Sequence, residues 1–459
     1  MLLNGLMIVW ITHFKIVTKR IVVCFNNFIF HVYILMTEII NLNIMYYIIY
    51  MSWSIYGNNY DLTDFIDKHP GGREILQKTR DMGDVTPLFE SYHAFANKTS
   101  IKASLENYKI EGKGEDTYDY TSYNTLCELI KDSYKFKRSN IKSTSFKHIY
   151  VLFLCLAYLI ITYFCLQELH IALEIMLGFV LGLIWLSLGF NVMHDASHYA
   201  YVKSQKINNY ASALWSNLAL GNHGMWFYHH VFYHHAFTNT KKDSDMYSMV
   251  PIYRKQDYQT TWRFPLWFYP IMVYVFPGYY YGQGILYFLS NCAGCVFHKD
   301  LKITEWNYSL MDALWFMFVF ILFYQRGFFC SFAFMVSCNI FYNINTIGDH
   351  ETFDVLVENH YEGKDWLKLQ VQNSANFKTD SPIYTYVFGG INYQIEHHLF
   401  PNMSNCFYSQ ISPTVQQFCK ENDIPYVVHK SLLEVFQEYY KTLNYFNAKT
   451  IYRFLIYTI

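Results

Sequence analysis

The sequence predicts a mainly α-helical membrane protein with a small, separate α+β domain near its N-terminus. Of its 459 residues, 53% are hydrophobic and only 15% are charged, whereas roughly a quarter of the residues are charged in an average soluble domain. Apolar segments of membrane-spanning length follow residue 148, while residues 37–112 alternate short apolar and polar stretches. A chain of this length also exceeds the usual size of one domain.

Charge and cysteine content exclude two classes of protein. The formal net charge is −1 and the pI is near 7.0, so no basic field is available to hold a nucleic acid. The ten cysteines follow no repeating spacing and several lie inside apolar runs, where they behave as small hydrophobic side chains. We therefore expect neither a nucleic-acid partner nor a disulfide scaffold.

Residues 1–36 form an apolar extension that we assign to no domain. Its charges, Lys15, Lys19 and Arg20, follow the first apolar run instead of preceding it, as they would in a signal peptide. Sequence typical of a folded domain begins near Met36, and one hypothesis is that translation starts there. Residues 37–112 are then the small domain, with a tyrosine-rich strand between Tyr46 and Tyr60.

A polar linker, residues 113–148, joins the small domain to the first apolar segment. It contains an amphipathic stretch around Leu126, Ile130 and Tyr134. A basic run follows directly before the apolar segment, at Lys135, Lys137, Arg138, Lys142 and Lys147. A basic flank of this kind predicts that this end of the segment faces the cytosol.

The membrane domain is expected over residues 149–430, with a tail over 431–459. Four segments have the roughly 17–25 apolar residues that a crossing needs, and they are 149–167, 171–192, 308–325 and 327–347. Short turns join them into two hairpins, which leaves the long polar stretches on one side. A further apolar segment, 264–290, contains three prolines and is interpreted as interfacial or re-entrant, because a single crossing would separate the histidine clusters described below.

A histidine and two glycines mark the small domain as a candidate haem site. His69 begins the sequence His-Pro-Gly-Gly at 69–72, and His93 follows 24 residues later. Two neutral imidazoles on opposite faces of a haem leave no open position for oxygen, which suits electron transfer. With residues 61–66 and 84–89, these motifs resemble the cytochrome b5 family, and the resemblance implies that His69 and His93 are the two haem ligands.

Three histidine clusters predict a metal centre. Each cluster has i, i+3 or i, i+4 spacing that places imidazoles on one helical face, and each lies at the cytosolic end of the predicted spans. Their members are His194 and His198; His230, His234 and His235; and His397 and His398 with Gln394. The alternative without a metal is a set of interfacial histidines that only form hydrogen bonds. Three clusters on one membrane face argue against this alternative.

The number and type of these side chains favour two iron ions. Removing hydrogen from an unactivated methylene needs a strongly oxidising metal centre, and imidazole suits iron better than thiolate does. Seven or eight neutral nitrogen ligands suffice for two metals with open positions. Structural zinc is a competitor, but it needs only four ligands.

The clusters and the residues around them resemble front-end fatty acyl desaturases with a fused N-terminal cytochrome b5 domain. The shared motifs include Trp226, 238–239 (Thr-Asn), Trp366 with 370–371 (Gln-Val), 389–392 (Gly-Gly-Ile-Asn) and 399–401 (Leu-Phe-Pro). The resemblance implies a desaturase domain with four transmembrane helices and a cytosolic histidine-rich cap. It also adds His350 and Gln394 to the metal site. The length of the second cluster resembles the delta-4 and delta-5 subgroup.

Other polar side chains near the clusters are expected to support the ligands. Glu396 and Asp195 are candidates for accepting an imidazole N–H. Asp243 and Asp245 are candidates for the same role, but ordinary solvated carboxylates are the preferred interpretation of these two. His223 and His229 stand where relatives carry other residues and are interpreted as supporting or incidental.

The resemblance implies a complete electron route and a location. Two non-haem iron ions and haem b are the expected cofactors. No Gly-x-Gly-x-x-Gly fingerprint is present, so electrons must come from a separate NADH–cytochrome b5 reductase. The substrate is an already unsaturated fatty acyl chain, linked to CoA or phospholipid, and the location is the endoplasmic reticulum membrane.

Three alternatives remain open from the sequence. A sphingolipid desaturase or acyl hydroxylase with a fused cytochrome b5 uses the same iron chemistry. A membrane-anchored cytochrome b5 electron carrier needs only the haem domain. A zinc-dependent membrane hydrolase needs zinc and no oxygen.

Overall fold

The computed structural model describes residues 52–80, 82–115, 117–137, 139–218, 223–247, 254–259, 265–275 and 310–457. The predicted N-terminal extension therefore lies outside the described residues. The chain divides into two compact units. The first comprises the chain up to Asp84 together with Asn107–Glu115, and the second comprises Val85–Glu106 and Asp116–Ile459.

The first unit is a small antiparallel sheet with short helices. Its elements are β1 (Trp53–Ile55), β2 (Asn58–Tyr60), the 3-10 helix η1 (Thr63–Lys68), α2 (Arg73–Thr79) and β3 (Lys109–Lys113). The strand order is β1-β2-β3, and Trp53 pairs with Tyr60. The predicted tyrosine-rich strand is therefore a hairpin, because Tyr56 and Gly57 both have positive φ, as a two-residue turn of this kind requires.

One tryptophan ties α2 to the sheet of the first unit. The Trp53 side chain is 1% exposed, and its indole N–H donates to the Leu76 carbonyl at 3.0 Å. Gly71, in the turn before α2, lies so close to His69 that a Cβ there would collide with the imidazole ring. Glycine at this position lets the backbone pass the ring closely.

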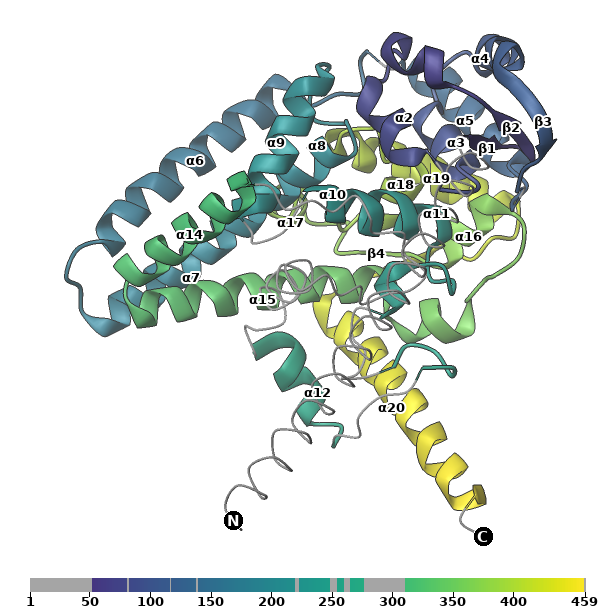
Figure 1. Cartoon of the computed structure of the whole chain (residues 1–459). Helices are drawn as coiled ribbons and strands as arrows, with labels where there is room; N and C mark the ends of the chain where they lie inside the picture. The colour runs from purple at the N-terminus through teal and green to yellow at the C-terminus, as the bar shows by residue number, and fades with distance from the viewer. Residues whose placement is uncertain are drawn as a thin grey trace, which may run out of the picture. The chain divides into compact units, whose positions relative to one another are not determined.

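The second unit is mainly helical and contains four long apolar helices. These are α6 (Ser145–Cys165), α7 (Ile171–Leu188), α14 (Leu310–Gln325) and α15 (Phe328–His350). Short turns join α6 to α7 and α14 to α15, so two hairpins form as the sequence predicts, and α15 runs alongside α7 (Figure 1). Many large apolar side chains of α6 are exposed, including Ile149, Phe153 and Leu159, which indicates a lipid environment.

Three of the described helices are long and apolar enough to cross a bilayer. They are Ser145–Cys165, Ile171–Ser197 and Phe328–Glu358. Helix α14 has 16 described residues, which is short of a full crossing, and its N-terminal neighbours lie outside the described residues. The structure therefore supports a membrane protein with a few apolar helices, and the predicted number of four spans is not confirmed.

Two glycines allow α7 and α15 to pack closely. A Cβ at Gly182 would lie 2.5 Å from the Phe334 carbonyl oxygen, and a Cβ at Gly178 would collide with the Cys330 backbone. Small residues four positions apart are typical of closely packed membrane helices. Because α7 leads to His194 and α15 ends at His350, this contact sets the distance between two predicted metal ligands.

The second unit contains further elements besides the four apolar helices. From α3 to η5 they are α3 (Thr86–Tyr92), α4 (Lys98–Leu105), α5 (Thr121–Tyr134), the π-helix η3 (Gly189–His194), α8 (Asp195–Ser197), α9 (Gln205–Leu218), α10 (His223–Trp226), the π-helix η4 (Phe227–His234), α11 (His235–Phe237) and η5 (Ser244–Tyr247). Towards the C-terminus they are α12 (Phe268–Pro270), η6 (Ile271–Val275), η7 (Asp354–Glu358), α16 (Trp366–Gln372), β4 (Ala375–Phe377), α17 (Pro382–Val387), α18 (Gln394–Leu399), η8 (Asn405–Phe407), α19 (Tyr408–Glu421), β5 (Val427–His429) and α20 (Leu432–Tyr457).

Two sequence predictions about local segments have different outcomes. Leu126 and Ile130 are fully buried on one face of α5, so the predicted amphipathic stretch is a helix that packs into the unit. Of the predicted re-entrant segment 264–290, only 265–275 lies among the described residues, where Tyr269 and Val273 pack in a core cluster with residues of α15 and α20. The rest of that prediction lies outside the described residues.

Candidate metal centre

Four histidines from three helical segments form the first group of candidate ligands. These are His194, His198, His230 and His397, and one ring nitrogen of each lies within 4.8 Å of those of the others. The Nε2 atoms of His194 and His230 are 3.0 Å apart. All four side chains are buried, so the group is shielded from bulk water.

Three further histidines form the second group, and one lies between the two groups. His234, His350 and His398 have ligand nitrogens within 4.8 Å of one another, and the Nε2 atoms of His234 and His350 are 3.2 Å apart. The ring of His235 stacks on that of His398 with centroids 4.3 Å apart, and it lies 4.5 Å from the ring of His198. The structure thus brings together every histidine that the sequence predicts as an iron ligand.

Wide helical turns position two of the clusters. His194 ends the π-helix η3, while His230 lies within the π-helix η4 and His234 ends it. The rings four residues apart remain neighbours, with centroids 5.0 Å apart for His194 and His198 and 5.3 Å apart for His230 and His234. Single π turns within helices are frequent at functional sites.

Hydrogen bonds on the outer ring nitrogens determine which nitrogens face inwards. His397 Nδ1 lies 3.1 Å from the Tyr408 hydroxyl, which donates to the Met403 carbonyl and therefore accepts from the ring. His398 Nδ1 donates to Gln370 Oε1 at 2.8 Å. Each ring consequently keeps its proton on Nδ1 and turns an Nε2 lone pair towards the centre, which is the arrangement of a metal ligand.

The pair formed by His234 and His350 shows why a cation fits the second group. His234 Nδ1 donates to the Asp243 carboxylate at 3.1 Å, and His350 Nδ1 donates to the Asn373 carbonyl at 2.9 Å. Two Nε2 lone pairs would then face each other at 3.2 Å. A metal ion, or a proton on His234 before metal binds, removes this repulsion.

Gln394 adjoins the second group through its amide. Its Nε2 lies 2.8 Å from His350 Nε2, and its Oε1 has no hydrogen-bond partner among the described residues. A half-turn of the amide exchanges these two atoms, because nitrogen and oxygen have nearly the same size. The side chain can therefore either donate to His350 or present its oxygen to a cation.

Burial keeps most of these rings neutral. Burial, followed by the neighbouring imidazoles, holds the pKa of His230, His235, His397 and His398 well below the usual histidine value. Burial also lowers the pKa of His234, but the carboxylates of Asp243 and Asp245 outweigh it and raise the pKa overall. Neutral rings are the form that binds a metal.

Several buried ring nitrogens have no hydrogen-bond partner among the described residues. They are Nε2 of His198, His397 and His398 and both ring nitrogens of His235. Leaving a buried polar atom unpaired costs roughly 1–3 kcal/mol, and so many in one place are unusual. The donor set therefore fits two metal ions with nitrogen ligands.

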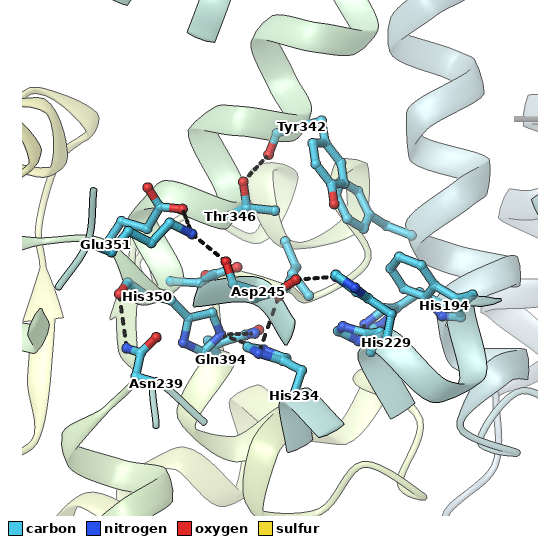
Figure 2. Close-up of a pocket in the computed structure, with 16 residues that line it drawn as sticks. His194, His229, His234, Asn239, Asp245, Tyr342, Thr346, His350, Glu351 and Gln394 are labelled. Atoms are coloured by element: carbon cyan, nitrogen blue, oxygen red, sulfur yellow. Dashed lines mark hydrogen bonds and ion pairs between the residues drawn. The ribbon is translucent and has the colours of Figure 1, made fainter. Parts of the chain in front are cut away.

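A pocket opens beside the histidines between η3, η4, α15 and α18 (Figure 2). Phe190, Tyr342 and Ile391 give it an apolar wall, and His194, His230, His234 and His350 line it towards the metal groups. Its polar side contains Lys255, paired with Glu351 at 2.7 Å. An apolar chain can thus lie next to the candidate metal ligands.

The predictions for three carboxylates need correction. Glu396 accepts hydrogen bonds from Asn376 and Tyr426, not from an imidazole. Asp195 pairs with Lys147. In contrast, Asp243 is fully buried against His234, so the prediction of a solvated carboxylate is wrong.

The two supporting histidines have separate surroundings. His229 forms an ion pair with Asp245, which also lies 3.3 Å from His234 Nδ1. His223 Nδ1 lies 3.0 Å from the Ser212 hydroxyl. His229 thus reaches the metal groups only through Asp245, and neither residue belongs to them.

The candidate haem ligands belong to different compact units. His69 follows η1 in the first unit, with Nδ1 3.1 Å from the Gly72 carbonyl oxygen. His93 ends α3 in the second unit, with Nδ1 2.8 Å from the Phe89 carbonyl oxygen. A carbonyl oxygen only accepts, so both rings carry their proton on Nδ1 and have an Nε2 lone pair.

Sequence reasoning missed the residues that contact the Nδ1 atoms of the candidate ligands. These are Tyr92, Thr238, Gln370, Asn373 and Tyr408, each with a polar atom within hydrogen-bonding distance of a candidate ligand. Thr238 and Gln370 lie in shared motifs, which was the available signal. The two tyrosines and Asn373 carry no such signal in the sequence.

Comparisons with known proteins place the two parts of the chain in described families. Residues 170–430 match the fatty acid desaturase family, and residues 51–113 match the cytochrome b5-like haem/steroid-binding domain. An acyl-lipid (8-3)-desaturase of Mortierella alpina is 25% identical over 429 residues, covering 85% of this chain and 92% of the relative. A probable Delta(5) fatty acid desaturase C of Dictyostelium discoideum is 25% identical over 84% of this chain and 89% of its own. A Delta(8)-fatty-acid desaturase of Borago officinalis is 24% identical, with coverage of 81% and 85%.

Proposed function

The chain belongs to the fatty acid desaturase family, and from this premise we propose that it catalyses oxygen-dependent front-end desaturation of an already unsaturated fatty acyl chain. The observation that carries the proposal is the convergence of the buried histidines into two metal-sized groups beside one pocket. A zinc site would need about half as many ligands. An electron carrier would need none of them.

The nitrogen ligands of the two groups are the side chains we propose as holding the iron ions. One ion is assigned to His194, His198, His230 and His397, and the other to His234, His350 and His398, with His235 between them. Gln394 adjoins the second ion, as its amide contact with His350 suggests. Bound iron supplies oxygen activation: a CH₂–CH₂ pair, O₂, two electrons and two protons yield CH=CH and two waters.

The residues of this chain position the acyl chain and maintain the ligands. Phe190, Tyr342 and Ile391 offer apolar contacts for the methylenes next to the metal groups. Burial excludes water from the rings, which protects a strongly oxidising centre from side reactions. Gln370 and Tyr408 hold His398 and His397 in the tautomer that binds metal.

Electrons are proposed to enter through the fused haem domain, residues 37–112, with His69 and His93 as the haem ligands. Both rings have their Nδ1 proton directed to a backbone carbonyl, so Nε2 is the nitrogen that would bind haem iron. A separate NADH–cytochrome b5 reductase is the proposed electron donor.

Regiochemistry is proposed from the relatives' names. Relatives named as (8-3)- or Delta(5)-desaturases agree with the delta-4 or delta-5 assignment that the second histidine cluster suggests. The acyl group is proposed to be carried on a lipid or on CoA.

Location and topology extend the same proposal. The chain is proposed to reside in the endoplasmic reticulum membrane, with α6, α7, α14 and α15 spanning it within a desaturase domain of residues 149–430. The haem domain and the histidines would face the cytosol.

Expression in yeast supplied with single polyunsaturated fatty acids tests the proposal. The intact chain should produce a new double bond between the existing one and the carboxyl end. His194→Ala should lose iron and product, and His69→Ala should lose haem and product. Unchanged product formation by His194→Ala would overturn the assignment, and a hydroxylated product would favour the acyl hydroxylase alternative.

A further inference from the structure

Tyr92 connects the segment that carries one predicted haem ligand to the candidate metal centre. It is the last residue of α3 and immediately precedes His93. Its hydroxyl lies 3.0 Å from Nδ1 of His198. Nε2 of the same imidazole has no hydrogen-bond partner among the described residues and belongs to the first metal group. Within the second unit, one side chain therefore contacts a candidate iron ligand and directly precedes a predicted haem ligand.

Further contacts hold this segment against the core of the same unit. The Tyr92 carbonyl accepts a hydrogen bond from Asn402 Nδ2 at 3.2 Å. The Phe95 ring stacks on Phe400, with centroids 5.4 Å apart, and Phe400 directly follows α18 with its two histidines. The position of Tyr92 relative to the metal group is thus set by contacts on both sides of His93.

Buried charges anchor the same helix from its other face. Glu90 is fully buried and pairs with Lys98, and Lys98 also donates to Asn124 of α5 at 2.6 Å. A buried carboxylate with a satisfied partner holds one geometry, because separating the pair leaves an uncompensated charge. Helix α3 is accordingly a fixed part of the second unit, not a loosely attached element.

We propose that Tyr92 is the positioning residue that couples the haem domain electronically to the iron centre. The inference rests on the proposed function. The path from His93 to His198 consists of covalent bonds to Tyr92 and one hydrogen bond from Tyr92 to His198. Electronic coupling along such a path is stronger than coupling across a gap between unbonded atoms. Each electron that passes converts ferrous haem to ferric haem and reduces the iron pair by one electron. Tyr92 keeps its proton and undergoes no net change, and two passes supply the two electrons of one turnover.

The test measures reoxidation of the haem in the full-length protein, loaded with haem and iron. The haem is reduced without oxygen by NADH and cytochrome b5 reductase, and the protein is then mixed with oxygen and an acyl substrate. Loss of the ferrous haem absorbance gives the rate of electron transfer to iron. Tyr92→Phe should slow this step about tenfold, the scale at which partners of metal-bound histidines act, without changing haem reduction or iron content.

Tyr408→Phe is the matched control because Tyr408 makes the same kind of contact with His397 of the same group. Its haem reoxidation, measured per bound iron, shows what loss of a positioning hydrogen bond alone does, and it should be slowed less than that of Tyr92→Phe. Equal slowing in both variants, or no slowing in Tyr92→Phe, would overturn the proposal.

Two further measurements separate the remaining outcomes. If Tyr92→Phe loses its iron, Asn402→Ala decides, because it removes a contact of the Tyr92 backbone and leaves the phenol in place. It should slow reoxidation with iron retained, and an unchanged rate would contradict the proposal. If the unaltered protein reoxidises its haem equally fast with and without iron, the proposed function itself fails.

Discussion

Gln370 accepts a hydrogen bond from His398 Nδ1 at 2.8 Å, while its own amide nitrogen donates to the His235 carbonyl at 3.0 Å. The second bond fixes the orientation of the amide, so that only its oxygen can face the imidazole. One glutamine of α16 therefore fixes the tautomer of a candidate iron ligand and holds the backbone of another.

Replacing this glutamine should weaken metal binding. Gln370→Leu removes the acceptor, and we expect iron affinity to fall about 10- to 100-fold, as measured by iron content after dialysis against a weak chelator. Gln372→Leu is the control on the same helix, since the side chain of Gln372 donates to the Asn359 carbonyl and contacts no candidate ligand among the described residues. Equal iron loss in both variants would show a general effect on α16.

Replacing Gly182 should separate α7 from α15. Gly182→Ala places a methyl group 2.5 Å from the Phe334 carbonyl oxygen, and relief of such overpacking costs about 1–3 kcal/mol. We expect a lower melting temperature and reduced iron content, because α7 leads to His194 and α15 ends at His350. Gly189→Ala is the control, since its methyl group would meet the nearest atom at 3.7 Å. A stable, iron-replete Gly182→Ala protein would contradict this account.

The buried pair of Lys147 and Asp195 should be sensitive to loss of one partner. Both side chains are at most 3% exposed, so Lys147→Met leaves a buried carboxylate uncompensated and should cost about 3–5 kcal/mol. Lys131→Met serves as the surface control, because its pair with Glu128 is exposed and is worth about 1 kcal/mol or less. Thermal unfolding in detergent compares the two, and equal shifts would be evidence against a buried pair.

Acid should destabilise the metal-free protein through its neutral histidines. The pKa values of His230, His235, His397 and His398 are lowered by burial, whereas unfolded histidine titrates near about 6.5. Below that pH the unfolded chain binds more protons, so stability falls as the pH decreases. Burial of Glu396 raises its pKa to about 7, and the carboxylates of Asp243 and Asp245 raise the pKa of His234. These two groups act in the opposite direction, but they are two against four.

The measurement for this prediction is thermal unfolding of chelator-treated protein over a pH series. The melting temperature should decline as the pH falls through the histidine range. A melting temperature that rises on acidification would contradict the burial of neutral rings.

The clusters could be predicted from sequence because helical spacing is a local property. The positions of His194 and His198, and of His230 and His234, already place each pair on one face. Their supports could not be predicted, because Tyr92 and Tyr408 approach the rings from elements distant in sequence. Glu396 was misjudged because adjacency to His397 says nothing about the partners, Asn376 and Tyr426, that occupy its carboxylate.

The membrane prediction was limited in a different way. Hydrophobicity predicted both hairpins, yet Lys147 was interpreted as part of a cytosolic basic flank and instead lies buried against Asp195. A charge count cannot distinguish a solvated lysine from one that folding encloses. The turn at Tyr56 and Gly57 was also missed, because a tyrosine with positive φ is uncommon.

The order in which the ligands occur along the chain has a consequence for biosynthesis. His194 and His230 precede α15, whereas His397 and His398 lie in α18 near the end of the desaturase region. A ribosome must therefore complete both hairpins and α18 before either group of ligands exists in full. Iron insertion is consequently a late step of maturation. A nascent chain that ends before Gln394 would lack His397 and His398 and could not retain the metal.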